Sequence, residues 1–180
     1  SGTGIVLDRE GNSIYFVFDE GCVQRFDLST KQLVWNSFDV NTFSALYEGF
    51  SPLLSEKYLY FGNGGALVRI EKSSGDEKIL LSNPDYKLEP LAISGDNLLV
   101  RAKKSRGTAQ FELWGVSADS GTILWQRNLK NAEPIDPPDE MAGLIDDNDW
   151  GWSWHITDAG LVLLTFSGEP NQVVVETLNP

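Results

Sequence analysis

Short segments that alternate apolar and polar residues, separated by turn residues, run along most of the chain. The most apolar are rich in β-branched and aromatic residues, and clusters of Gly, Asn and Asp follow them, as is typical of β-hairpins. These runs are 14–18, 58–61 and 98–100. A shorter apolar segment precedes each of them, namely Ile5–Leu7, Pro52–Leu54 and Pro90–Ile93. No segment shows a sustained helical period, so the chain is predicted to be all-β.

One turn segment recurs three times along the chain. Each copy has an apolar–polar pair, a turn with Ser or Thr and Gly or Lys, and an apolar run that ends in Trp or Ile; the copies are 25–35, 69–79 and 115–125. The end residues Trp35, Ile79 and Trp125 lie 44 (79 − 35) and 46 (125 − 79) positions apart. This period is typical of four-stranded β-propeller blades.

Four blades are therefore predicted, at about 4–40, 45–83, 88–130 and 150–180, with an inserted loop at 131–153. The fourth blade is predicted to be incomplete, because the chain stops before the outermost strand of its sheet. The fold class is thus a partial or half propeller made of antiparallel sheets.

The turn segment resembles the repeat of the PQQ-like β-propeller family, which includes quinoprotein dehydrogenases and non-catalytic relatives. Gly121 and Trp125 match the family motif, as do Asp27 and Trp35, whereas Lys31 stands at the glycine position. The resemblance implies that Trp35, Ile79 and Trp125, together with Gly75 and Gly121, dock one blade on the next. It implies a non-catalytic member with a binding, scaffold or sensor role, and an extracytoplasmic location.

The charge of the chain is unevenly distributed. The formal net charge is −12, and all 14 Lys and Arg lie in residues 1–130 beside 16 acids (26 − 10), whereas residues 131–180 hold 10 acids and no Lys or Arg. An acidic protein is a poor partner for nucleic acid, so a nucleic-acid-binding function is excluded. No apolar run is long enough for a membrane helix.

The acidic insert holds the candidate binding residues. A partner-docking loop and a solvated connector are both open for this segment. The carboxylate and amide oxygens of Asp146, Asp147, Asn148 and Asp149 are weak candidates for a Ca²⁺ site, without the glutamate that a helix–loop–helix site requires. No other cofactor is predicted.

A row of tryptophans follows the acidic residues. Trp150, Trp152 and Trp154 alternate along the chain, so in an extended segment they share one face. Such a row is either a platform for a ligand or partner, or a strand buried between blades. His155 is the single histidine, and no nucleophile motif accompanies it.

Taken together, these residues predict a non-catalytic propeller module that binds a protein or a small ligand. Two alternatives stay open: a fragment of a PQQ-dependent oxidoreductase, and a half propeller that pairs with a second chain or with further blades. Cys22 is the single cysteine, which excludes an internal disulfide.

Overall fold

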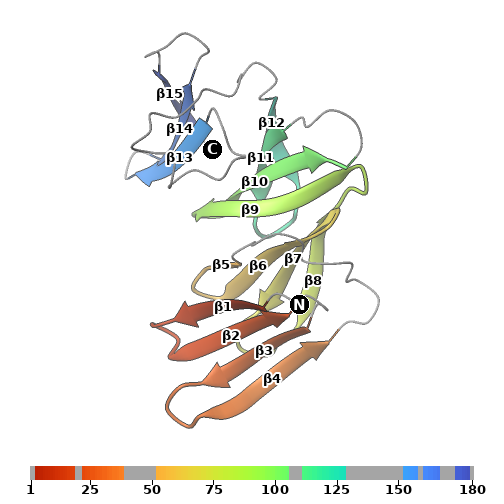
Figure 1. The fold of residues 1–180 in the computed structure, drawn as a ribbon, viewed down its shortest axis with the longest axis vertical. Coiled ribbons are helices and arrows are strands. Elements are labelled where there is room, and N and C mark those ends of the chain that lie inside the picture. The colour runs from red at the N-terminus through yellow and green to blue at the C-terminus, as the bar shows by residue number, and fades with distance from the viewer. Residues whose placement is uncertain are drawn as a thin grey trace.

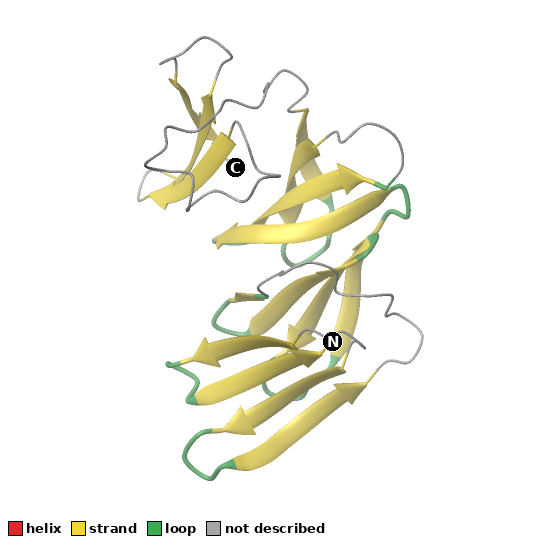
Figure 2. Cartoon of the chain, in the orientation of Figure 1, coloured by secondary structure: helices red, strands yellow, loops and turns green. Residues whose placement is uncertain are grey.

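The structure is a computed structural model that describes residues 3–18, 22–38, 52–105, 111–128, 152–157, 160–166 and 173–178. Every regular element in these ranges is a β-strand, as Figure 2 shows, and the strands form four antiparallel sheets. The all-β prediction is confirmed.

The sheets are built from strands that follow one another in sequence. Sheet 1 contains β1 (Thr3–Asp8), β2 (Ser13–Phe18), β3 (Cys22–Asp27) and β4 (Gln32–Phe38). Sheet 2 contains β5 (Leu53–Leu54), β6 (Tyr58–Asn63), β7 (Ala66–Glu71) and β8 (Glu77–Ser82). Sheet 3 contains β9 (Tyr86–Ser94), β10 (Asn97–Lys104), β11 (Phe111–Ser117) and β12 (Ile123–Asn128). Sheet 4 contains β13 (Trp152–Thr157), β14 (Gly160–Phe166) and β15 (Val173–Leu178).

The sheets follow one another along the long axis of the molecule in chain order (Figure 1), and shared apolar cores pack sheet 1 against sheet 2 and sheet 2 against sheet 3. The order of strands within each sheet is the order in the sequence, so each sheet is a simple meander with hairpin connections. This is the architecture of consecutive propeller blades, in which each sheet buries its faces against its neighbours.

Two apolar cores lie between the first three sheets. The core between sheets 1 and 2 includes the fully buried Tyr15, Val23, Leu59 and Ile70. The core between sheets 2 and 3 contains Leu67, Leu98, Val116 and the bulky Trp114, which is 1% exposed. Because side chains alternate along a strand, Leu59 and Phe61 of β6 face sheet 1 while Tyr60 between them faces sheet 3.

The turns between the third and fourth strands carry the repeated segment. Lys31, Gly75 and Gly121 hold the same place in these three turns, and all have positive φ, at 57°, 80° and 77°. Glycine adopts this conformation without a steric penalty, whereas a lysine adopts it at some cost. The sequence repeat is therefore a repeat of backbone conformation.

Candidate functional site

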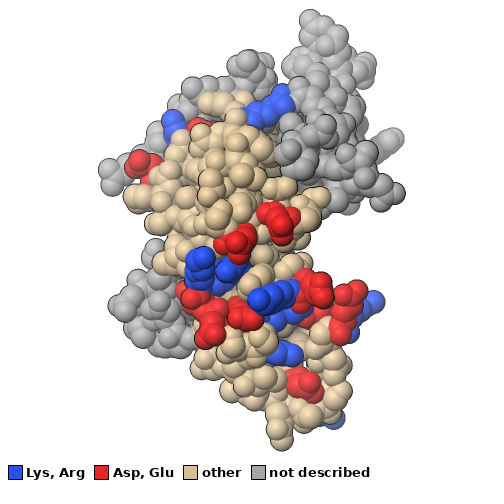
Figure 3. All heavy atoms as spheres, turned by 180° about the vertical axis from the view of Figure 1, so that it is seen from behind, with Lys and Arg blue, Asp and Glu red and all other residues tan. Residues whose placement is uncertain are grey.

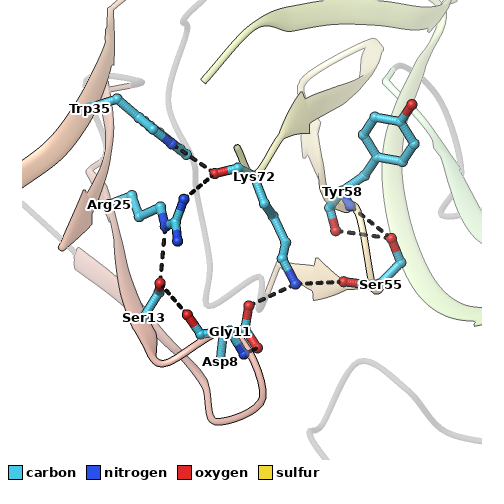
Figure 4. A network of polar contacts seen from close by, with 8 residues as sticks. All are labelled: Asp8, Gly11, Ser13, Arg25, Trp35, Ser55, Tyr58 and Lys72. Atoms are coloured by element: carbon cyan, nitrogen blue, oxygen red, sulfur yellow. Dashed lines mark hydrogen bonds and ion pairs between the residues drawn. The ribbon is translucent and has the colours of Figure 1, made fainter. Parts of the chain in front are cut away.

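The best-defined group of polar residues lies at the joint between sheets 1 and 2, which we call the first joint (Figure 4). The backbone carbonyl of Lys72, in the turn between β7 and β8, accepts two hydrogen bonds from sheet 1. One comes from Nε1 of Trp35, at 2.9 Å, and the other from Nη1 of Arg25, at 2.7 Å. Two strands of sheet 1 are therefore tied to one carbonyl of sheet 2.

The indole of Trp35 lies flat against the glycine of the same turn. A Cβ atom built at Gly75 would lie 2.8 Å from Cδ2 of Trp35, closer than two carbon atoms can approach. The indole also contacts the buried ring of Tyr15, with ring centroids 5.9 Å apart. Trp35 thus fills the space between two twisted sheets and satisfies its N–H donor on the neighbouring backbone.

The ammonium group of Lys72 points back into sheet 1. Its Nζ lies 2.7 Å from Oδ2 of Asp8 and donates a hydrogen bond to the carbonyl of Ser55 at 3.0 Å. The side chains of Lys72 and Asp8 are 14% and 7% exposed, so water screens this ion pair poorly. The N–H of Gly11 donates to Oδ1 of Asp8 at 2.9 Å, which satisfies the second carboxylate oxygen.

These contacts change the acidity of Asp8. Burial raises the pKa of its carboxyl group, whereas the hydrogen bonds from Lys72 and from the Gly11 N–H, and the charges of Lys72 and Arg25, lower it. The lowering contributions prevail, so the pKa lies below its ordinary value of 3.8. Asp8 is therefore ionised at neutral pH and pairs with a cationic Lys72.

The joint between sheets 2 and 3, which we call the second joint, has an arginine at the equivalent position, but different residues surround it. Arg69 stands in β7 where Arg25 stands in β3, and its Nη1 donates to the carbonyl of Ala118 at 3.0 Å. Ala118 occupies the place in its turn that Lys72 has in the preceding one. The guanidinium of Arg69 stacks on the ring of Tyr58, with Cζ 4.2 Å from the centroid.

Among the described residues, no indole covers the turn glycine of the second joint, and Trp114 lies in the core between its two sheets. Ile79, which the repeat places at the position of Trp35, pairs with Val68, faces back toward sheet 1 and is 45% exposed. In sheet 2 the register shift falls after Ile79, at Leu80, whereas in sheet 1 it falls at Val34, before Trp35. Ile79 therefore does not occupy the position predicted for it, because the bulge turns it to the other face of the sheet.

Leu80 contacts the turn of sheet 3 instead. It is 8% exposed and belongs to the core between sheets 2 and 3. A Cβ atom built at Gly121 would lie only 1.9 Å from the backbone oxygen of Leu80. Gly121 thus lies against the next sheet, as Gly75 does, but the contact is backbone on backbone.

The remaining predicted residues differ in how far they are described. Trp125 pairs with Gly115 across β11 and β12, and its indole covers that glycine. Trp152 and Trp154 lie on β13, paired with Thr165 and Leu163. The others of the predicted acidic and tryptophan set, Asp146, Asp147, Asn148, Asp149 and Trp150, lie outside the described residues.

Sequence reasoning missed the arginines and the Asp8–Lys72 pair. A signal for the arginines was present, because Arg25 and Arg69 each stand two residues before the acid that opens the turn, Asp27 and Glu71. No comparable signal marks Asp8 and Lys72, since nothing in the sequence brings these two positions together. Within the described ranges, no cluster of His, Cys, Asp and Glu is arranged to hold a metal ion, and no helix is long and apolar enough to cross a membrane.

Comparison with known proteins shows the fold. No family model matches the sequence, and no curated protein matches it. The chain is similar to the quinohemoprotein alcohol dehydrogenase from Comamonas testosteroni, with 14% identity and a TM-score of 0.62 over 91% of this chain and 29% of that one. It is similar to BamB from Moraxella catarrhalis, with 15% identity and a TM-score of 0.55 over 98% of this chain and 52% of that one.

A designed protein has a chain of similar extent. The computationally designed Ika4 protein is 12% identical, with a TM-score of 0.54 over 99% of this chain and 92% of the designed one. The natural neighbours are PQQ-type propeller proteins, and this chain spans about half of BamB and less than a third of the dehydrogenase. The sheets are thus blades of a β-propeller, and at these identities the likeness shows the fold alone.

Proposed function

We propose that these blades belong to a non-catalytic β-propeller that binds a partner protein or ligand as a scaffold or sensor module. The observation that carries this proposal is the use of the polar groups at the first joint. Arg25, Trp35, Lys72 and Asp8 engage one another across two sheets, so they hold the shape of the scaffold and leave no free acid–base pair there. A rigid scaffold of this kind presents its loops to partners.

The distribution of charge indicates the chemistry of the partner. On the face drawn in Figure 3, lysines and arginines lie among aspartates and glutamates near the middle of the molecule, so the described sheets carry no single-sign field there. The acidic excess lies instead in residues 131–180, with 10 acids and no Lys or Arg. Opposite charges steer association, so the proposed partner presents a basic surface to this segment.

A binding measurement with matched variants tests this proposal. The probe is a fluorescent lysine-rich peptide, and its anisotropy is followed at low and at high salt. We expect Asp146, Asp147 and Asp149 changed together to Asn to weaken binding by about tenfold, since three charges leave the proposed surface. The control changes Asp85 and Asp96 to Asn and Glu56 to Gln, which removes the same charge from exposed turns of the described sheets.

The control variant is expected to bind within about threefold of the unmodified protein. Equal losses in the two variants would mean that net charge alone attracts the peptide, and would contradict a docking role for the insert. Absence of any salt-dependent binding would contradict the basic partner.

The alternative function is a part of a quinone-dependent oxidoreductase, which is favoured by the likeness to quinohemoprotein alcohol dehydrogenases. Titration with PQQ and Ca²⁺, followed by absorbance, separates the two proposals. We expect no saturable change in the spectrum. A saturable change with a stoichiometry near one would overturn the non-catalytic assignment in favour of this alternative.

A further inference from the structure

One face of sheet 1 is apolar and is covered by no other described element. Ile5, Leu7 and Leu33 are 62%, 49% and 48% exposed, and their neighbours Ile14 and Phe26 are only partly buried. The pairing register places Leu7, Ile14, Phe26 and Leu33 in one row across all four strands. An uncovered apolar row of this length on a sheet face is typical of an interaction surface.

The equivalent rows of the next two sheets show what such a row is built to contact. They are Leu54, Leu59 and Ile70 in sheet 2, and Ile93, Leu98, Val116 and Ile123 in sheet 3. Leu59, Ile70, Leu98 and Val116 are fully buried, each against the sheet that precedes its own. The first three strands share this register, and the fourth-strand position of the row is Leu33 in sheet 1, Glu77 in sheet 2 and Ile123 in sheet 3. The row of sheet 1 therefore has the geometry of a surface that receives a preceding blade.

The turn between β3 and β4 of sheet 1 has the same backbone hydrogen bond as the turns that accept an arginine at the two joints. The N–H of Leu28 donates to the carbonyl of Asn12 at 3.0 Å. The amides at the same place in the later turns do likewise, from Lys72 to Lys57 at 3.0 Å and from Ala118 to Asp96 at 2.7 Å. In those turns the carbonyls of Lys72 and Ala118 then accept an arginine from the preceding sheet. The carbonyl of Leu28 is held in the same way and accepts no hydrogen bond from any described residue.

One residue of this turn differs from the other two. Lys31 stands where Gly75 and Gly121 stand, with the same positive φ. A Cβ atom at Gly75 would lie 2.8 Å from the indole of Trp35, so the Cβ of Lys31 leaves no room for an indole in that arrangement. An arginine reaches the turn carbonyl from the third strand of its sheet, so it needs no contact with the position of Lys31.

We propose that this face of sheet 1, made of Ile5, Leu7, Ile14, Phe26 and Leu33 with the carbonyl of Leu28, docks a further propeller blade through an arginine and rejects a blade that presents a tryptophan. The selectivity comes from Lys31. The apolar row supplies most of the buried area, and the guanidinium fixes the register of the two sheets.

The docked blade comes from outside residues 1–180 and is not a second copy of them. Arg25 and Arg69 are already bonded to turn carbonyls within the chain. Sheet 3 has Gly115 at the corresponding position, and the register of β14 with β15 places Thr177 there in sheet 4. At this third-strand position, a second copy therefore has only Arg25 and Arg69, which are already bonded to turn carbonyls within the described residues.

The test adds a blade to the intact chain. A copy of residues 3–51 is placed ahead of residue 3 as an added blade. One added blade keeps its own Trp35, and in the other this residue is replaced by Leu. Both added blades retain their own Arg25. Each form is made with Lys31 and with Lys31→Gly in the host sheet, and both thermal unfolding and urea unfolding are followed by circular dichroism. We expect the tryptophan-free blade to raise the Tm of the Lys31 host by about 4 °C and to increase the m-value, because apolar area becomes buried.

The tryptophan-bearing blade is expected to give a comparable gain only on the Lys31→Gly host. Phe26→Asp in the host should abolish the gain, whereas Val34→Asp, a matched charge on an exposed residue that lies at the bulge, should leave it unchanged. A gain on Lys31 that is as large with the tryptophan-bearing blade overturns the selectivity, and no gain with any blade overturns the docking face. Light scattering of the unmodified chain adds a last outcome: a concentration-dependent dimer that Phe26→Asp dissociates would show that a second copy covers this face, and would overturn the proposal.

Discussion

The two joints between the first three sheets perform the same task with different residues. At the first joint, the indole of Trp35 covers Gly75, and the buried pair of Asp8 and Lys72 also joins the two sheets. At the second joint, the backbone of Leu80 covers Gly121, and no buried ion pair is found among the described residues there. The constant parts are the glycine with positive φ and an arginine bonded to the turn carbonyl.

This difference shows which parts of the repeat are required by geometry. A blade needs a donor that reaches the turn of the next blade and a surface that fits against the glycine of that turn. An indole provides both functions in one side chain, whereas the second joint divides them between Arg69 and Leu80. The tryptophan is thus one solution to the packing problem, and the arginine is common to both joints.

The largest effect is expected when the two glycines are replaced. Gly121→Ala places a Cβ atom 1.9 Å from a backbone oxygen that cannot rotate away, while Gly75→Ala meets a side chain that can shift. Both changes also force alanine into a positive φ. We expect Gly121→Ala to lower the free energy of unfolding by about 4 kcal/mol and Gly75→Ala by about 2 kcal/mol, measured by urea unfolding. Equal losses would mean that φ alone determines the cost.

Loss of the buried ion pair should rank next. Asp8→Asn leaves the ammonium group of Lys72 buried without its counter-charge, which we expect to cost about 3 kcal/mol. Lys72→Met removes the other partner and should cost a similar amount, and the double variant should cost less than the sum of the two. Additive losses would indicate that Asp8 and Lys72 act independently.

The same pair predicts how stability depends on pH. The pKa of Asp8 is lower in the folded protein than in the unfolded chain, so its contribution is complete above the unfolded value, near 3.8, and is lost as pH falls through the folded value. We expect the difference in unfolding free energy between the unmodified protein and Asp8→Asn to be constant from pH 7 to about pH 5, and to shrink below about pH 4. A difference that persists unchanged into strong acid would contradict the lowered pKa.

The fold was more predictable than the joints. Alternation and turn residues are local, so segments such as 14–18 and 58–61 revealed strands, and the period of the turn revealed blades. The joint residues depend on register, which the sequence does not encode locally. The bulge at Leu80 turned Ile79 away from the next sheet, and the pairing of Asp8 with Lys72 joins residues 64 positions apart (72 − 8). The acidic set around Asp146 stays a prediction.

The smallest effects come from the fourth-strand residues themselves, and they distinguish the two joints directly. Trp35→Phe keeps an aromatic ring near Gly75 but removes the Nε1 donor to the Lys72 carbonyl, which also receives Arg25; we expect a loss of about 1 kcal/mol. Ile79→Ala at the equivalent position should change the unfolding free energy by less than about 0.5 kcal/mol, because Ile79 is 45% exposed and faces away from sheet 3. Both values come from urea unfolding, with Leu124→Ala as the control for an exposed bulge residue of sheet 3 that is similarly exposed, at 49%. A loss at Ile79 as large as the loss at Trp35 would mean that both residues stabilise their joints equally, and would contradict the exposed position of Ile79 outside the second joint.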